Sequence, residues 1–244
     1  MPTWREGSPP SMSDLFDVYP ELSAAIGELC GGASWCVTGV SALPSDSDGS
    51  LCLEIAKPKH WLQGPAGVTT IGMGAIGGSL EPGEMLLDCL QREAREEIGA
   101  PLQVRSAGAG EAYGDTYLVY EQRQIVAVRL PQRDYPRPAF FTVSANLHRR
   151  DTLDAEVLTI ATFCAALIAP PVIGDLFGLV RAPRATLSRL LGAATISLEE
   201  LRGLEGLCLD THEPLPANAL LQPVWTVRSL QLLLQAGFLG PLAL

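Results

Sequence analysis

The chain is short of basic residues and of long apolar runs. Lys and Arg number 17 against 27 Asp and Glu, which gives a formal net charge of −10. That balance disfavours a long polyanionic partner such as duplex DNA. The longest apolar run is broken by Pro170 and Pro171, and the first residues lack the apolar core of a signal peptide. We therefore expect neither duplex DNA nor a membrane among the partners of this protein.

The chain also lacks paired cysteines. Its six cysteines are scattered, and none forms a C-x-x-C pair or stands beside a histidine. This spacing is not that of a zinc site. We expect reduced thiols and a cytoplasmic protein. Cys89 falls within an acidic helix and is expected to be buried, as free cysteines usually are.

One segment, residues 78–100, carries several carboxylates with little to neutralise them. Glu93, Glu96 and Glu97 are spaced three and four residues apart, so on a helix they share one face. The adjoining face is apolar, with Leu87, Leu90, Ala94 and Ile98. Carboxylates crowded beside a buried face favour a hard divalent cation, and Mg²⁺ prefers oxygen ligands of this kind. The pattern predicts a metal site.

The same segment resembles the signature of the Nudix hydrolases. That signature is Gly, five residues, Glu, seven residues, Arg-Glu, an aliphatic residue, any residue, Glu-Glu, any residue, Gly and an aliphatic residue. This chain matches it at Gly78, Glu84, Arg92, Glu93, Ala94, Glu96, Glu97, Gly99 and Ala100. Gly77, Glu81 and Gly83 also match the usual start of the family's loop.

The resemblance implies roles for these residues. The metal ligands would be the carbonyl of Gly78 and the side chains of Glu93, Glu96 and Glu97, holding Mg²⁺ or, as a substitute, Mn²⁺. Glu93 would be a ligand or the general base, and the sequence leaves both open. Glu97 would act in catalysis through the metal, Arg92 would orient Glu93 by a charge-assisted hydrogen bond, and Glu84 would organise the loop near the helix N-terminus.

Family members often take one further acid from a loop beyond the signature. We expect Glu156 first and Asp154 next, with Glu111 and Asp134 as other candidates. For each of them a solvated loop acid is the alternative, because Asp and Glu are mostly exposed in proteins.

Three residues are candidates for substrate binding. Trp61, which follows Lys59 and His60, and Tyr113 offer rings for stacking, although such rings more often pack in a core. Arg149, in the basic triplet 148–150, offers charge for phosphates, and a solvated turn is the alternative.

We divide the chain into an N-terminal segment with a short helix (1–32), a Nudix domain (33–165) and a C-terminal extension (166–244). The fold expected from the resemblance is α/β, a Nudix α/β/α sandwich with a mixed β-sheet plus a mainly helical C-terminal extension. Expected strands cover 35–43, 51–56, 68–76, 102–107, 116–120, 124–130 and 139–145, the first two forming a hairpin. Expected helices cover 20–29, 185–191, 198–204 and 223–235, the third opened by the capping box Ser197-x-x-Glu200.

The last of these helices is strongly apolar. Its apolar side chains are Val224, Trp225, Val227, Leu230, Leu232, Leu233 and Leu234. We expect it to pack on the domain or on a second copy of the chain, since the resemblance implies a homodimer.

The resemblance implies a Mg²⁺-dependent pyrophosphohydrolase. Its substrate would be a small phosphorylated nucleotide, a nucleoside diphosphate linked to another group, such as ADP-ribose or a dinucleotide. One alternative is a nucleoside triphosphate pyrophosphatase. The other is a Nudix-fold ligand sensor or scaffold that acts through its helical tail.

Overall fold

The computed structural model describes residues 13–107, 111–121, 123–147 and 154–238. Within these residues fourteen strands form one sheet. They are β1 Trp35–Ser45, β2 Leu51–Ile55, β3 Leu62–Gln63, β4 Thr69–Gly74, β5 Ile76–Ser79, β6 Leu102–Arg105, β7 Tyr113–Tyr120, β8 Gln124–Pro131, β9 Phe140–Ala145, β10 Val157–Leu167, β11 Gly178–Ala182, β12 Ile196–Ser197, β13 Cys208–Thr211 and β14 Ala219–Pro223. The α-helices are α1 Ser13–Val18, α2 Pro20–Leu29, α3 Leu86–Ile98, α4 Leu187–Leu190, α5 Leu198–Arg202 and α6 Trp225–Gln235.

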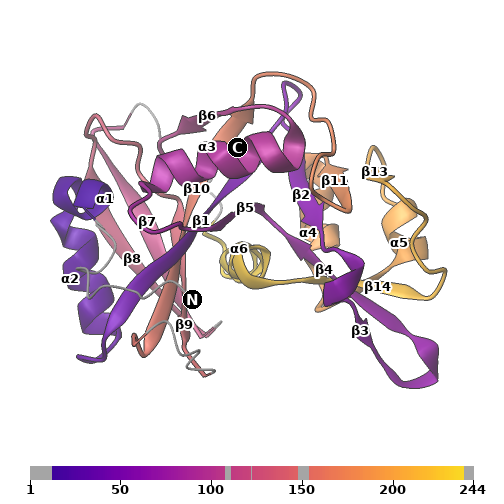
Figure 1. The fold of residues 1–244 in the computed structure, drawn as a ribbon, viewed down its shortest axis with the longest axis horizontal. Coiled ribbons are helices and arrows are strands. Elements are labelled where there is room, and N and C mark those ends of the chain that lie inside the picture. The colour runs from indigo at the N-terminus through magenta and orange to yellow at the C-terminus, as the bar shows by residue number, and fades with distance from the viewer. Residues whose placement is uncertain (1–12, 108–110, 122, 148–153, 239–244) are drawn as a thin grey trace, which may run out of the picture.

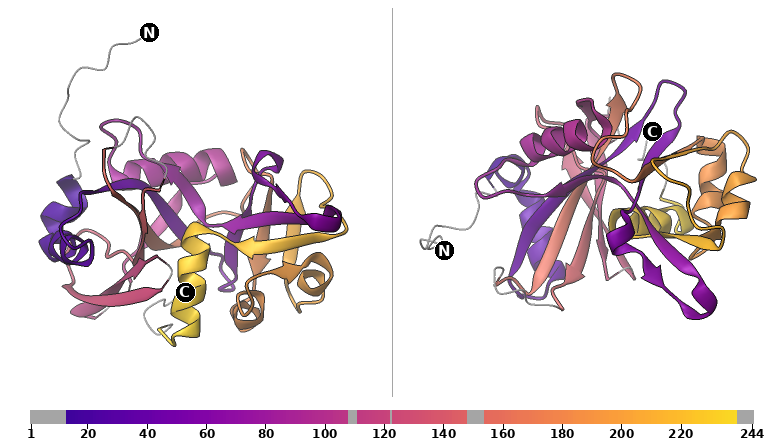
Figure 2. Two further views of the ribbon diagram at one scale, coloured as in Figure 1. Left: turned by 90° about the horizontal axis from the view of Figure 1, so that it is seen from below. Right: turned by 45° about the vertical axis from the view of Figure 1, so that its right-hand side comes forward.

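Helices cover both faces of the sheet. Alternate residues of a strand point to opposite faces, and β1 shows this with Val40 and Leu43. Val40 belongs to the core that contains the apolar residues of α1, α2 and α3, whereas Leu43 belongs to the core that contains those of α4, α5 and α6. Figures 1 and 2 show α3 and α6 on opposite sides of β5. The chain is therefore an α/β/α sandwich with a mixed sheet, as the sequence predicts.

The sheet runs in the order β12-β14-β4-β2-β1-β10-β9-β7-β8, with β5 attached to β1 and β11 to β2. The central pair, β1 and β10, is parallel. Residues after 165 supply helices α4, α5 and α6, and they also supply strands that the sequence did not indicate. Of these, β14 pairs parallel with β4, and β11 pairs antiparallel with β2. The extension thus adds to the same sheet, and at the right of Figure 1 it lies beside β2 and β4.

Two strand predictions need correction. The hairpin of 35–43 with 51–56 exists only at its turn, where Ser45 pairs with Leu51. Beyond that pair β1 takes β10 and β5 as neighbours, while β2 takes β4 and β11. The expected strand 68–76 is two strands, β4 and β5, which separate at Ala75 and pair with different partners. Apolar alternation marks a strand but does not identify its neighbour.

The predicted helices of the extension are present with shifted ends. The capping box is formed, since Ser197 Oγ accepts from the backbone N–H of Glu200 at 3.1 Å. Helix α6 packs on the domain through Val227, Leu230 and Leu233. Trp225, expected among its buried residues, is 60% exposed. No helix in the described part of the chain is long and apolar enough to cross a bilayer.

Candidate metal centre

Helix α3 presents the carboxylates of the signature. Its apolar side chains at Leu86, Leu90, Ala94 and Ile98 recur every four residues and are buried against the sheet. The helix ends at Gly99, whose φ of 68° is a left-handed conformation that glycine adopts without strain. Helix α3 packs directly on β5 and β1. Glu93 and Glu97, one helical turn apart, consequently face the glycine-rich strand β5.

Glu97 is held against the backbone of β5. Its Oε2 accepts a hydrogen bond from the N–H of Gly77 at 2.9 Å. Burial first, and then the nearby carboxylates of Glu54 and Glu93, raise the pKa of Glu97 to about 9, although the hydrogen bond from the Gly77 N–H lowers it. The folded chain therefore gathers carboxyl groups at a place where water is partly excluded.

Glu93 belongs to a network around Arg92. The Nε and Nη2 of Arg92 donate to the two carboxylate oxygens of Glu84 at 2.8 and 3.0 Å, and its Nη1 donates to Glu93 Oε1 at 2.7 Å. Nη2 also donates to the carbonyl of Ser79 at 3.2 Å. The guanidinium holds the pKa of Glu84 at about 2, well below its usual range. Arg92 thus ties the loop before α3 to the carboxylate that lies within the site.

Glycine at position 78 is required by the close approach of Glu93. A Cβ at Gly78 would lie 2.2 Å from Glu93 Oε1, so any other residue would displace that carboxylate. Position 77 is equally restricted, because its φ is 143° and a Cβ there would lie 2.2 Å from the carbonyl oxygen of Val40. The two glycines allow the backbone of β5 to lie directly beneath the carboxylates.

The sequence analysis missed Glu54, on β2. Burial is the main cause that raises the pKa of Glu54 to about 7; Lys57 acts against this rise and Glu93 contributes to it. Its neighbours Leu53 and Ile55 are fully buried on the other face of β2. A single acid in the apolar strand 51–55 was the signal that could have identified it. Lys57 also forms an ion pair with Asp175 at 2.8 Å.

A divalent cation suits this set of donors. Glu54, Glu93 and Glu97 lie near enough to act on one another electrostatically, and the positive charge that acts on both Glu54 and Glu97 comes from Lys57. In the described residues, no group of three or more His, Cys, Asp or Glu side chains already has a metal-binding arrangement. The donors are hard oxygens around a closely approached glycine backbone, which fits Mg²⁺.

The segment after β10 closes the C-terminal end of α3. The N–H groups of Val172, Gly174 and Asp175 donate to the carbonyls of Ile98, Glu97 and Glu96 at 3.0, 2.8 and 2.7 Å. A Cβ at Gly174 would lie 2.1 Å from the carbonyl oxygen of Glu96. The extension therefore satisfies the carbonyls that a helix end leaves unpaired, and it does so on the turn that carries Glu96 and Glu97.

The structure does not bring the expected further acid to this cluster. Glu156 is exposed and accepts from the N–H of Ser34 at 3.2 Å. It precedes Val157, the partner of Trp35, whereas Gly78 pairs with Val40. Five residues along β1 correspond to roughly 16 Å. The other acids, Asp154, Glu111 and Asp134, are also exposed outside helix α3 and strand β5.

The aromatic candidates have other surroundings. Trp61 donates its Nε1–H to the carbonyl of Ala56 at 2.7 Å and packs edge-on against Phe177, so it contributes to the core. Tyr113 is 53% exposed on β7, which is three strands from β1, or roughly 14 Å. Arg149 lies outside the described residues.

The fold and the carboxylate helix define the Nudix class of α/β sandwich. Residues 38–155 match the family described as NUDIX domain. This part of the chain is a Nudix domain, the domain of the Nudix hydrolases.

Solved structures are similar to this chain at low identity. For the Escherichia coli ORF135 protein the identity is 15%, the match covers 66% of this chain and 81% of that protein, and the TM-score is 0.35. For a MutT protein from Methanosarcina mazei Go1 the identity is 15%, the coverages are 66% and 83%, and the TM-score is 0.37. For a MutT protein from Bacillus halodurans the identity is 16%, the coverages are 62% and 71%, and the TM-score is 0.31. Among curated proteins, none matches this chain.

Proposed function

We propose that this protein is a Mg²⁺-dependent pyrophosphohydrolase that splits the phosphoanhydride of a nucleoside diphosphate linked to another group. The observation that carries the proposal is the placement of the carboxylates beside the glycines of β5: Glu97 accepts from the N–H of Gly77 at 2.9 Å, and Glu93 Oε1 lies 2.2 Å from the position of a Cβ at Gly78. Such a cluster of like charges is costly unless a cation shares it. A metal-bound diphosphate is the small anion that this chemistry suits.

We assign the metal to the Gly78 carbonyl and to Glu93, Glu96 and Glu97, with Glu54 as the further acid. Mg²⁺ or Mn²⁺, when bound, supplies charge neutralisation for the phosphate oxygens. Glu96 is the most accessible of these groups, with 54% of its side chain exposed. Its carboxylate lies 3.6 Å from Arg92 Nη1, an ion pair at the surface that it would exchange for the metal ion.

The remaining residues position the reacting groups. Arg92 keeps Glu93 aimed over Gly78 and leaves its second oxygen available. Glu93 and Glu54 are the two carboxylates suited to take a proton from the attacking water, and the assignment between them stays open. Lys57 lies near both Glu54 and Glu97 and can leave its exposed partner Asp175 to meet a phosphate.

We also propose that the protein acts in a reducing cytoplasm and as a homodimer. All six cysteines are free, which is consistent with reduced thiols. The dimer rests on the family resemblance, and light scattering on the purified chain measures it.

The test is hydrolysis of a nucleotide panel with Mg²⁺, with Mn²⁺ and with excess chelator. ADP-ribose, NADH, diadenosine polyphosphates, sugar nucleotides and nucleoside triphosphates are each incubated, and the released products are identified. We expect at least one diphosphate-linked compound to be split into two phosphorylated products only when metal is present. Undiminished hydrolysis in chelator would refute the metal mechanism.

The same panel separates the alternatives. Release of inorganic pyrophosphate from triphosphates alone would favour the triphosphate pyrophosphatase. Binding of nucleotides without turnover would favour the ligand sensor. A Glu93→Gln variant is the matched negative control, because it keeps the shape of the side chain and removes its charge.

A further inference from the structure

Trp225, the first residue of α6, combines exposure with backbone strain. It is 60% exposed, and its φ is 44°, in the left-handed region that bulky side chains avoid. Such a conformation costs of the order of 1–3 kcal/mol and persists only where the surroundings impose it. An observed outlier of this kind, on an exposed tryptophan, calls for a functional explanation.

The residues on either side of Trp225 are anchored. The N–H of Val224 donates to the carbonyl of Met73 at 3.1 Å. On the other side, Thr226 is buried and its Oγ1 lies 3.1 Å from the Oγ of Ser41, a hydrogen bond between two strand-facing hydroxyls. Because both neighbours are held, the turn between them is fixed and the indole is held outside the core.

These anchors place Trp225 beside the carboxylates. Ser41 pairs with Gly77, whose N–H holds Glu97. Met73 is followed by Gly74, where a Cβ would lie 3.1 Å from Glu54 Oε2. Neighbouring strands are about 4.8 Å apart, so the start of α6 lies roughly two strand spacings, or about 10 Å, from the acidic cluster.

The residue that precedes the indole lies on the same face of the sheet as Glu54. A Cβ at Gly72 would lie 3.2 and 3.3 Å from the two γ carbons of Val224 and 3.4 Å from the Cβ of Ala56. Gly72 and Gly74 are two residues apart on β4, so their Cβ directions, one toward Val224 and the other toward Glu54, share a face. Val224 and Glu54 therefore lie on one face of β2 and β4, and Trp225 follows directly.

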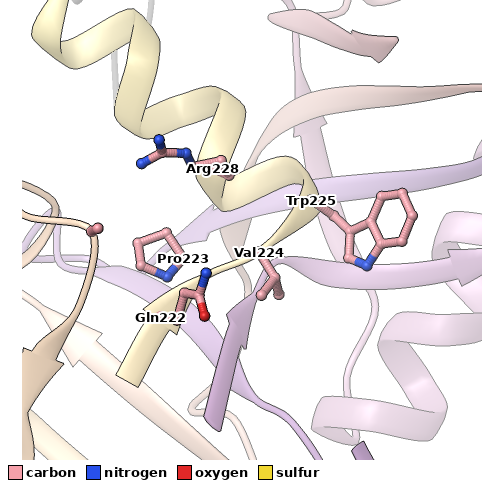
Figure 3. A pocket seen from close by; sticks show the side chains of 6 residues that line it. Gln222, Pro223, Val224, Trp225 and Arg228 are labelled. Carbon is pink, nitrogen blue, oxygen red and sulfur yellow. The ribbon is translucent and has the colours of Figure 1, made fainter. Parts of the chain in front are cut away.

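A cavity of about 340 Å³ opens at this turn, lined by Ala194, Gln222, Pro223, Val224, Trp225 and Arg228. That volume lies at the lower end of the range for small-molecule sites. Figure 3 shows the ring of Trp225 on the opposite side of the turn from the guanidinium of Arg228. The residues of the turn include the polar Gln222 and Arg228, so the turn is not a broad apolar patch of the kind that protein partners use.

We propose that Trp225 is the platform on which the nucleobase of the substrate stacks, with the diphosphate extending toward Glu54 and Glu97. This inference rests on the proposed function and adds a specificity residue from the C-terminal extension. An indole face accepts any planar base, and such stacking is worth about 5- to 150-fold in binding when the ring is removed. The distance from ring to carboxylates suits a ribose and two phosphates between them.

The test compares Trp225→Gly with Trp225→Phe. Glycine accepts a φ of 44° without strain, so the fold should be retained, whereas phenylalanine keeps an aromatic face. Leu62→Ala, on β3 and 66% exposed in the parent protein, is the control for loss of an exposed apolar side chain elsewhere. Circular dichroism and melting curves verify folding, and KM and kcat are measured for the nucleotide that the parent hydrolyses best.

We expect Trp225→Gly to raise KM by about 10- to 100-fold, Trp225→Phe to recover most of that loss, and Leu62→Ala to leave KM unchanged. A readout without turnover uses fluorescence in Mg²⁺. ADP should quench the parent protein but not Trp225→Phe, and ribose 5-phosphate, which has no base, should quench neither.

The outcomes separate this inference from the proposed function. Hydrolysis by the parent with an unchanged KM in Trp225→Gly would overturn the platform and leave the hydrolase standing. Quenching by ADP through Trp225 without any hydrolysis would support the platform and refute the enzyme. A changed oligomeric state in Trp225→Gly, with KM unchanged, would show that the indole is a contact between copies, which also overturns the platform.

Discussion

Replacing Glu97 by Gln should have two opposite effects. It should weaken activity and stabilise the metal-free protein. Glu97→Gln keeps the shape of the side chain, and its amide oxygen can still accept the hydrogen bond from the Gly77 N–H. The substitution removes the ionisable group from a cluster that also contains Glu54 and Glu93, so that the folded protein no longer has to hold a proton there. The matched control is Glu205→Gln, which removes one charge from an exposed turn.

The magnitude follows from the pKa of Glu97, raised from 4.5 to about 9. Between these values the folded protein holds a proton that the unfolded chain has released, so metal-free stability falls as pH rises through this window. At pH 8.5 the difference of about 4 pH units sets a ceiling of about 5 kcal/mol at 1.36 kcal/mol per unit. Glu97 is only partly buried, so screening reduces the effect to about 1–3 kcal/mol. At pH 5.5, about one unit above the ordinary value, the same reasoning leaves roughly 0.3–0.8 kcal/mol.

The assay is thermal unfolding in chelator at pH 5.5 and pH 8.5, both above the sequence pI of about 4.8. We expect Glu97→Gln to melt about 3–10 °C above the parent at pH 8.5 and within about 3 °C of it at pH 5.5. With Mg²⁺ present, its activity should fall by at least about 100-fold. A melting temperature lowered equally at both pH values, with activity per folded molecule unchanged, would show that Glu97 is a structural acceptor only.

Two further predictions concern the cap of α3 and the protons of the site. Gly174→Ala should lower the free energy of unfolding by about 1–3 kcal/mol in denaturant, because its Cβ would lie 2.1 Å from the Glu96 carbonyl oxygen. The control is Gly27→Ala, where the atom nearest to the new Cβ would be 3.9 Å away. This control should be neutral or stabilising. Mg²⁺ binding at pH 7 should release roughly 1.5 protons, because Glu97 with a pKa of about 9 is protonated there and Glu54 with a pKa of about 7 is half protonated. Calorimetry in two buffers of different ionisation enthalpy measures that number, and a value of zero would contradict the assignment.

The sequence determined the local part of the site. Spacings of three and four place Glu93 and Glu97 on one face of a helix whatever surrounds it, and the buried stripe through Leu90 and Ala94 directs that helix to the sheet. Gly78 and Gly99 could likewise be recognised, because a close approach and a left-handed turn need glycine. These features depend on residues within a few turns of one another, so pattern alone predicts them.

The tertiary structure decided what joins that helix. Glu54 enters the cluster because β2 lies against β4 and not in a hairpin with β1, and alternation in a strand does not say which strand is its neighbour. Trp225 is exposed, although its apolar segment predicted burial, because hydrogen bonds from Val224 and Thr226 to strands more than 140 residues earlier hold it at a positive φ. Helical and strand periodicity report which face of an element is buried. Which distant elements meet depends on the packing of the whole sheet. That packing alone set the positions of Glu54 and Trp225.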